Sequence, residues 1–299
     1  MERPSIAVII NFCTNEARFL RACIEQCRLF SQQIIVPVCE RFFDGTKENH
    51  ELLNRIYASF PEVLFVEYPY ISGYSPGYLP SVSRFVGAQY LDEEIDRVFF
   101  LDADEIPEGK RILDWLEMSD WSQHSVLKMA NYWYFREPRF RAKLWEDSVV
   151  FVQAKTLEPA LLLHDRERDA IYDLLPGPKK RNVTGFDGAP LFHHYSWVRT
   201  KDEMIKKVKS WSHREDRDWV SLVEQEFSAP FRGTDFIHGY TYLEVDPLFE
   251  VSLESNNFSN KAEKKRAVRF PEEKLLKLLG VKGIWKFLKA KFRQLLSRA

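Results

Sequence analysis

The first hundred residues alternate between two hydrophobic patterns, one typical of strands and one typical of helices. Short, largely β-branched runs occupy Ile6–Ile10, Ile34–Val38 and Val63–Val66. Between and after them, apolar residues recur at helical spacing, which predicts a helix after Thr14, a second over Glu51–Phe60 and a third over Ser83–Leu91. Strands that alternate with helices are typical of a mostly parallel sheet, so the chain is expected to be an α/β protein.

The next strand-like run, from Val98 to Leu101, ends in Asp102, Asp104 and Glu105. Side chains alternate faces along an extended chain, so Asp102 and Asp104 are expected to point the same way, as two oxygen ligands of one hard cation would. Ligands of open α/β sheets collect at the carboxyl ends of the strands, where these carboxylates would lie. A solvated acidic turn is the alternative interpretation, because Asp and Glu are common in turns.

After a helix over Arg111–Met118, the pattern changes to aromatic stretches at Val126–Phe135 and Ser148–Thr156. These predict a mixed or antiparallel sheet. The segment Leu175–Asp187 contains Pro-Gly-Pro and three consecutive basic residues, which predicts an exposed loop. The sequence Thr200-Lys-Asp-Glu203 is a capping box, which predicts a helix from there to about His213.

The composition is that of a folded globular protein, with 45% apolar and 14% aromatic residues in 299. All four cysteines fall in the first 40 residues without metal-binding spacing, and are expected to be reduced core residues. We find neither a signal-peptide pattern nor a run of about 18 apolar residues, so a cytoplasmic protein is expected.

The net charge of -1 conceals an uneven distribution. Residues 261–299 contain 13 Lys and Arg against 3 Glu, so an acidic body carries a basic tail. An acidic body does not favour nucleic-acid binding by the main domain, whereas the tail could contact a polyanionic surface.

The tail carries an apolar stripe at helical spacing, formed by Val281, Ile284, Trp285, Leu288, Phe292, Leu295 and Leu296. Lysines and arginines occupy the other face, a pattern typical of helices that lie on anionic membranes. Docking of this stripe on the body is the alternative. We therefore predict a main domain over 1–250, a linker over 251–270 and a basic amphipathic helix over 271–299, with peripheral attachment to the inner membrane face as an option.

Several short segments together resemble the GT-A glycosyltransferases that use nucleotide-diphosphate sugars. Asn15–Leu20 resembles the NEAxxL segment of family 2 enzymes, Asp44–Thr46 their DGT, Ser83–Ala88 their ARNxG segment and Asp102–Asp104 their DxD motif. Asp104–Pro107 and His194–Trp197 resemble the DEIP and HxSW elements of the family 17 N-acetylglucosaminyltransferase-like proteins. The resemblance implies a GT-A fold: a Rossmann-like nucleotide-binding half, a mixed-sheet acceptor half and, here, the C-terminal amphipathic extension.

The resemblance also implies a reaction. A sugar would pass from a nucleotide-diphosphate donor to a saccharide or a lipid-linked saccharide, with Mn²⁺ or Mg²⁺ neutralising the diphosphate that leaves. By family position, Asp102, Asp104 and His194 would contact the metal, Asp102 through water or the ribose. An imidazole is an acceptable ligand for Mn²⁺ beside carboxylates.

Three further residues occupy family positions for donor binding, and each has a structural alternative. Arg84 would contact the nucleotide or the diphosphate, or would pair with a surface carboxylate. Glu40 would bind the base or ribose, or would be an exposed glutamate. Trp197 would pack against a sugar, or would be a core residue.

The catalytic base must be a carboxylate within reach of the acceptor hydroxyl. Glu105 and Asp187 are the first candidates, and the Glu146–Asp147 pair is a further one. The chain lacks a clear QxxRW-type signature, so neither processivity nor stereochemistry is predicted.

Two other functions compete with this interpretation. A phosphatase of the haloacid-dehalogenase type also has two aspartates after an apolar strand, but its motif would want Thr or Val at Ile106 and usually follows the first strand. A degenerate GT-A domain could act as a membrane-tethered binding module. Donor turnover would distinguish such a module from an enzyme.

Overall fold

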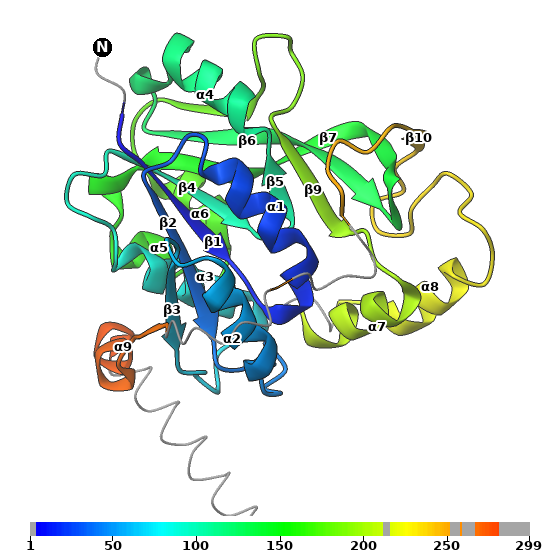
Figure 1. Ribbon diagram of the computed structural model, residues 1–299, viewed down its shortest axis with the longest axis horizontal. Helices are drawn as coiled ribbons and strands as arrows, with labels where there is room; N and C mark the ends of the chain where they lie inside the picture. Colours follow the sequence, from blue (N-terminus) through cyan, green and yellow to red (C-terminus); the bar gives the residue numbers. More distant parts are fainter. Residues whose placement is uncertain (1–3, 212–215, 252–257, 259–266, 281–299) are drawn as a thin grey trace, which may run out of the picture.

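Eleven strands form a single sheet in the described residues, which are 4–211, 216–251, 258 and 267–280 of the computed structural model. The strands are β1 (Ile6–Asn11), β2 (Gln33–Cys39), β3 (Leu64–Tyr68), β4 (Arg97–Asp102), β5 (Glu105–Pro107), β6 (Val126–Phe135), β7 (Glu137–Gln153), β8 (Lys179–Val183), β9 (Phe192–Trp197), β10 (Tyr242–Glu244) and β11 (Val268–Arg269). Their order is β11-β3-β2-β1-β4-β7-β6-β9-β5, with β10 beside β7 and β8 beside β6 (Figure 1).

The sheet has a parallel part and a mixed part. β11, β3, β2, β1 and β4 lie side by side in this order, and each pair among them is parallel. From β4 onward the directions change: β7 is antiparallel to both β4 and β6, and β6 is parallel to β9. The predicted α/β fold, with a parallel half followed by a mixed half, is confirmed.

Helices cover both faces of the parallel part, and two further helices pack on the mixed part. They are α1 (Ala17–Cys27), α2 (His50–Ser59), α3 (Leu79–Ala88), α4 (Gly109–Met118), α5 (Pro159–Leu162), α6 (Glu167–Leu174), α7 (Lys201–Ser210), α8 (Trp219–Glu226) and α9 (Glu272–Leu278). α1, α2 and α4 share one core with Val8 of β1, whereas α3, α5, α6 and α9 share another with Ile9. Successive side chains of β1 point to opposite faces of the sheet, so this one strand contributes to both cores. Each fully buried aliphatic side chain stabilises the fold by about 1.5–3 kcal/mol.

Gly87 allows α3 to lie directly against the central strand. A Cβ atom at this position would be 2.6 Å from Cγ2 of Ile9, which is too close for any side chain. The glycine of the Ser83–Ala88 segment is therefore explained by close packing of α3 on β1. This packing sets the position of Arg84 on the same helix.

The structure extends or shifts several predicted elements. α3 begins at Leu79, four residues before the predicted start, with Pro80 in its first turn, where a missing N–H costs nothing. β7 begins at Glu137 rather than Ser148, because its charged first half pairs with β6. The predicted exposed loop over 175–187 contains β8, which adds to β6 in parallel. Most of the segment is exposed, as predicted, but residues 179–183 form a strand and not a loop, because pairing with β6 overrides the local turn signals.

The C-terminal boundary also differs from the prediction. Val268 and Arg269 pair with β3, and Phe270 is buried, so the predicted linker over 251–270 does not extend to its expected end. The next segment, α9, buries Leu275 in the core beside α3. The first turns of the predicted 271–299 helix thus dock on the body, and residues 281–299, with most of the amphipathic stripe, lie outside the described residues.

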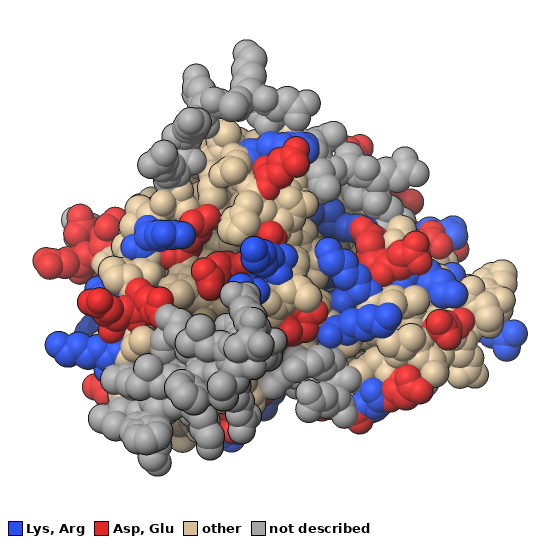
Figure 2. Space-filling model, turned by 90° about the horizontal axis from the view of Figure 1, so that it is seen from below, with Lys and Arg blue, Asp and Glu red and all other residues tan. Residues whose placement is uncertain are grey.

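The carboxyl ends of β1, β2 and β3 point downward in Figure 1, and Figure 2 views the molecule from that side. Basic and acidic side chains are interspersed over the described part of this face (Figure 2). No helix among the described residues has both the length and the apolar composition needed to cross a membrane.

Candidate functional site

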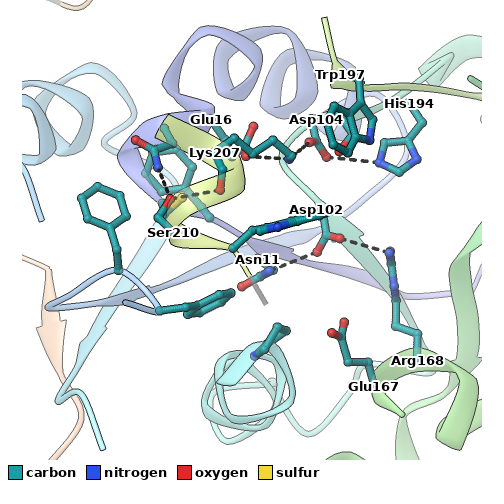
Figure 3. Close-up of a pocket in the computed structure, with 18 of the residues that line it drawn as sticks. Asn11, Glu16, Asp102, Asp104, Glu167, Arg168, His194, Trp197, Lys207 and Ser210 are labelled. Carbon is teal, nitrogen blue, oxygen red and sulfur yellow. Dashed lines mark hydrogen bonds and ion pairs between the residues drawn. The ribbon is translucent and has the colours of Figure 1, made fainter. Parts of the chain in front are cut away.

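A pocket of about 610 Å³ lies at the carboxyl ends of the parallel strands. Its lining includes Asn11 from β1, Cys39 from β2 and Asp102 from β4, together with side chains from α3, α6, β9 and α7 (Figure 3). The edge at which α/β proteins bind ligands is thus hollowed here, as the position of the acidic cluster predicted.

Asp102 is fixed by three donors. The register of β1 against β4 places Asn11 opposite Asp102, and the Asn11 amide donates to Oδ1 at 3.1 Å. Arg84 Nη2 donates to the same oxygen at 2.7 Å, and Arg168 Nη2 donates to Oδ2 at 3.0 Å. Burial raises the pKa of Asp102, but the charges of Arg168 and Arg84 outweigh this and hold the pKa below its ordinary value. Asp102 is therefore an ionised anchor with both oxygens engaged.

Glu105 is fully buried and is not among the residues that line the pocket. Its Oε2 accepts from the backbone N–H of Asp102 at 2.7 Å and from Arg168 Nη1 at 2.5 Å, while Oε1 accepts from Arg168 Nη2 at 3.1 Å. This placement is at odds with the hypothesis that Glu105 is the catalytic base, because a carboxylate enclosed by Arg168 cannot reach an acceptor hydroxyl. Glu105 instead braces the turn between Asp102 and Asp104.

The start of α6 brings Glu167 and Arg168 to the pocket. Glu167 has a φ of +51°, a left-handed conformation that costs free energy for a residue with a Cβ atom. Its Oε2 accepts from Arg84 Nη1 at 2.9 Å. Arg84 and Arg168 therefore link three carboxylates. The buried Arg84 lines the pocket and is paired with two of them, and its predicted contact with a nucleotide or diphosphate stays a prediction.

Asp104 lies beside a histidine and two cations. The pairing of β5 with β9 sets Glu105 opposite His194, and His194 Nε2 is 3.6 Å from Oδ1 of Asp104. Lys207 Nζ is 3.7 Å and Arg199 Nη2 3.9 Å from Oδ2. Burial raises the pKa of Asp104, but His194, Lys207 and Arg199 together hold it well below its ordinary value. Asp104 is ionised, and both Asp104 and His194 line the pocket and point toward each other (Figure 3).

The His194 imidazole is buried between these groups. Burial lowers its pKa, but the hydrogen-bonding and charge effects of Asp104, with smaller effects from Glu105 and Glu146, raise it above the ordinary value. Its Nδ1 atom is buried without a hydrogen-bond partner. His193, the other histidine of the pair, points elsewhere and bonds to Tyr134 and Glu108.

α7 delivers Lys207 to the pocket. The capping box forms as predicted: Glu203 N–H donates to the Thr200 hydroxyl, and the Glu203 carboxylate accepts from the Thr200 N–H at 2.9 Å. Lys207, two turns after this cap, is largely buried, and its ammonium lies 3.5 Å from Glu16 Oε1. A cation thus faces Asp104 from a helix that follows β9 directly.

The other end of the pocket is aromatic. Trp197 is 1% exposed, and its ring packs on Trp211 and Trp219 with centroids 5.3 Å and 5.9 Å apart. It is thus a core residue that also contributes to the pocket lining. Trp133 and the carboxylate of Glu146 line the pocket as well.

Besides Glu105, two predicted site residues lie outside the pocket lining. Asp187 is exposed and pairs with Arg111 at 2.6 Å, so this acidic side chain is bound to a surface cation and the structure does not support it as the base. Glu40 is exposed and accepts from the Tyr70 N–H at 3.3 Å, although its neighbours Cys39 and Arg41 do line the pocket.

Several pocket residues were missed from the sequence, chiefly Arg168, Lys207 and Glu16. Each lies more than 60 residues from the acidic strand. Glu16 belongs to the Asn15–Leu20 segment, but the resemblance gave it no role, and Arg168 and Lys207 belong to no motif. The only signal at Arg168 and Lys207 is a long basic side chain on a helix. Such a signal does not identify a partner.

The residues predicted to hold a metal are only partly brought together. Asp104 and His194 face each other, but Asp102 is committed to Arg84 and Arg168. Within the described ranges, no group of three or more His, Cys, Asp or Glu side chains is arranged to hold a metal ion.

Comparison with known proteins gives limited information. No protein-family model and no curated protein matches the chain. Among solved structures, 4-diphosphocytidyl-2C-methyl-D-erythritol synthase from Anaerococcus prevotii DSM 20548 matches 72% of this chain and 100% of its own, at 11% identity and a TM-score of 0.42.

Two other solved structures match about three quarters of this chain. The glycosyltransferase GlyE of Streptococcus pneumoniae TIGR4 matches 75% of this chain and 64% of its own, at 12% identity and a TM-score of 0.38. TarS 1-349 of S. aureus matches 76% and 72%, at 11% identity and a TM-score of 0.40. Likeness at this level does not show what the present chain binds.

Proposed function

We propose that the chain is a glycosyltransferase that takes a sugar from a nucleotide-diphosphate donor, with its reaction centre beside Asp104. The observation that carries the proposal is the pairing of ionised Asp104 with His194 and Lys207 in a pocket at the end of the central parallel strand. This agrees with the motif resemblance, which assigns the DxD position to Asp102–Asp104.

The donor would lie along the carboxyl ends of β1, β2 and β4. Phe42, Phe43 and Tyr68 provide a partly aromatic wall at the end of β2 and β3, which suits a nucleoside base. Lys207, at the pocket's centre, provides a positive charge for a diphosphate. The donor's charge would therefore meet the cationic side chains that now balance Asp104 and Glu16.

A divalent cation fits Asp104 and His194. A carboxylate oxygen and an imidazole nitrogen are a donor set that Mn²⁺ accepts, and these two side chains already face each other in the pocket. When bound there, the ion would neutralise charge on the departing diphosphate. Asp102 would act through Arg84 and Arg168, which hold both its oxygens.

The acceptor would enter from the aromatic end of the pocket. Trp133, Trp197 and Trp219 line that end, and flat aromatic surfaces suit the faces of sugar rings. We propose a saccharide acceptor, free or lipid-linked.

A catalytically inactive binding module is the second candidate. The observation that favours it is the engagement of both Asp102 oxygens: Oδ1 accepts from Asn11 and Arg84 and Oδ2 accepts from Arg168, which leaves one lone-pair direction, on Oδ2, for a ligand. Such a module would bind the donor without releasing a nucleoside diphosphate from it.

The proposal is tested by thermal unfolding with a panel of nucleotide-diphosphate sugars, with and without Mn²⁺. A ligand that binds the folded state at 100 times its Kd stabilises it by about 2.7 kcal/mol, enough to raise Tm by several degrees. We expect a Mn²⁺-dependent rise with one or a few donors. A folded protein that responds to none of them would contradict the proposal.

A further inference from the structure

A second group of polar side chains lies at the aromatic end of the pocket, around Glu146 of β7. The Tyr240 hydroxyl donates to Glu146 Oε1 at 3.1 Å, and His238 Nε2 is 3.6 Å from the same oxygen. The Glu146 side chain is 26% exposed and lines the pocket together with His238. A carboxylate held by two neighbours but open to the cavity is therefore present.

The segment that carries His238 and Tyr240 is built around a buried aspartate. Oδ1 of Asp235 accepts from the backbone N–H groups of Ile237, His238 and Gly239 at 2.7, 2.6 and 3.1 Å. Its Oδ2 accepts from the Tyr242 hydroxyl at 2.7 Å. The turn is thus fixed by four hydrogen bonds to one carboxylate, which sets both side chains against Glu146 before any ligand arrives.

Glu146 lies close to the proposed reaction centre. The Trp133 ring makes edge contacts with His194 on one side, at a centroid distance of 4.8 Å, and with His238 on the other, at 5.1 Å. His194 in turn faces Asp104. The Trp133 indole therefore contacts both His194, which faces Asp104, and His238, which lies beside Glu146.

Other carboxylates of the pocket have cationic partners. Asp102 pairs with Arg84 and Arg168, and Glu167 with Arg84. Asp104 and Glu16 both lie near Lys207 and Arg199. A neighbouring Lys or Arg stabilises the charged carboxylate and weakens it as a proton acceptor.

The described neighbours of Glu146 are a phenol and an imidazole, not a lysine or an arginine. The Tyr240 phenol is a neutral donor, because burial and the nearby carboxylate of Glu146 raise its pKa to about 12. Neither a phenol nor an imidazole carries the permanent positive charge of a guanidinium. Among the compared carboxylates, Glu146 has the environment expected of a general base.

We propose that Glu146 is the catalytic base of the transfer, with His238 and Tyr240 as positioning residues. The inference rests on the proposed function. The acceptor hydroxyl gives its proton to the Glu146 carboxylate as its oxygen bonds to the anomeric carbon of the donor sugar. The bond from that carbon to the diphosphate oxygen breaks, and the nucleoside diphosphate leaves with the electron pair. The assignment replaces Glu105 and Asp187, neither of which lines the pocket.

The test compares Glu146→Gln with wild type, using the donor that raises Tm. Release of nucleoside diphosphate is measured with water alone and with a panel of octyl glycosides as acceptors. Gln keeps the oxygen that accepts from Tyr240 but cannot take a proton. We expect turnover to fall about 10²- to 10⁴-fold while the Kd of the donor stays within about twofold.

Glu137→Gln is the matched control, because Glu137 lies on the same strand, is exposed and is absent from the pocket lining. It should turn over like wild type. Glu146→Asp keeps a carboxylate and should retain more activity than Glu146→Gln. Tyr240→Phe, as a test of positioning, should lower kcat several-fold with little change in the KM of the acceptor or the Kd of the donor.

The outcomes separate this inference from the proposed function. Glu146→Gln with near wild-type turnover would overturn the assignment of the base and leave donor use intact. A wild type that binds the donor but releases no nucleoside diphosphate would also overturn it. A wild type that binds no donor would overturn the proposed function itself.

Discussion

At the scale of single residues, the acidic run after β4 separates into carboxylates with different partners. Asp102 and Asp104 both line the pocket, as their spacing predicted, while Glu105 turns into the core. Alternation along a strand predicts which residues share a face. It does not predict that Arg168, 63 residues after Glu105, supplies the charge that lets Glu105 be buried.

Arg168→Met should destabilise the protein strongly. Glu105 would be left as an uncompensated buried charge, which typically costs about 3–5 kcal/mol. The free energy of unfolding from urea titration measures the effect. Arg166→Met, in the same segment but at a half-exposed arginine, is the control and should change little.

A second substitution refines this test. Glu105→Gln removes the stranded charge, so the double variant Arg168→Met/Glu105→Gln should recover part of the lost stability. If Arg168→Met unfolds at the same urea concentration as wild type, the buried pair does not brace the acidic turn.

At the scale of elements, local patterns predicted the chain well where neighbouring residues decide the structure. The alternation over residues 6–102 and the capping box at Thr200 both formed. β8 and the first half of β7 were not predicted, because their polar, charged sequences have no strand periodicity of their own. Pairing with the long strand β6 makes them strands.

Ion pairs bind β6, β7 and β8 together at Asp147. Both Asp147 oxygens accept from Arg181 at 2.8 Å, and Lys128 Nζ is 3.1 Å from Oδ1. Burial raises the pKa of Asp147, but Arg181 and Lys128 more than offset this and lower it. Asp147 therefore contributes stability that is fully present above the pKa of an unfolded aspartate, about 3.9, and is lost as the pH falls through the lower folded pKa.

Asp147→Asn should accordingly lower the free energy of unfolding at pH 7 by about 1–3 kcal/mol, the usual cost of leaving a buried partner unsatisfied. The difference from wild type should shrink as the pH falls from about 4 toward 3. Urea titrations from pH 7 to pH 3 measure both curves. A difference that stays constant over this range would rule out the ionised state of Asp147 as its source.

At the scale of the whole molecule, the pocket is assembled from segments that are distant in sequence. The turn between β4 and β5 provides Asp104, β9 provides His194, α7 provides Lys207 and β7 provides Glu146. The resemblance to GT-A enzymes predicted the first two at one site, and they lie together in the pocket. Motifs carry long-range information that periodicity lacks. The positions of Lys207 and Glu146 depend on how β7 and β9 pair with distant strands. Local sequence patterns do not encode this pairing.

The central claim is that Asp104 is part of the binding site of a nucleotide-diphosphate sugar. Calorimetric titration with the donor, which measures its Kd, tests this claim most directly. Wild type and Asp104→Asn would be titrated with the stabilising donor in the presence and absence of Mn²⁺. Circular dichroism and Tm would establish that the variant is folded.

We expect wild type to bind the donor tightly with Mn²⁺ and weakly without it. Asp104→Asn should bind at least tenfold more weakly with Mn²⁺, because it loses the ionised oxygen that faces His194. A folded Asp104→Asn variant with wild-type donor affinity would contradict the account.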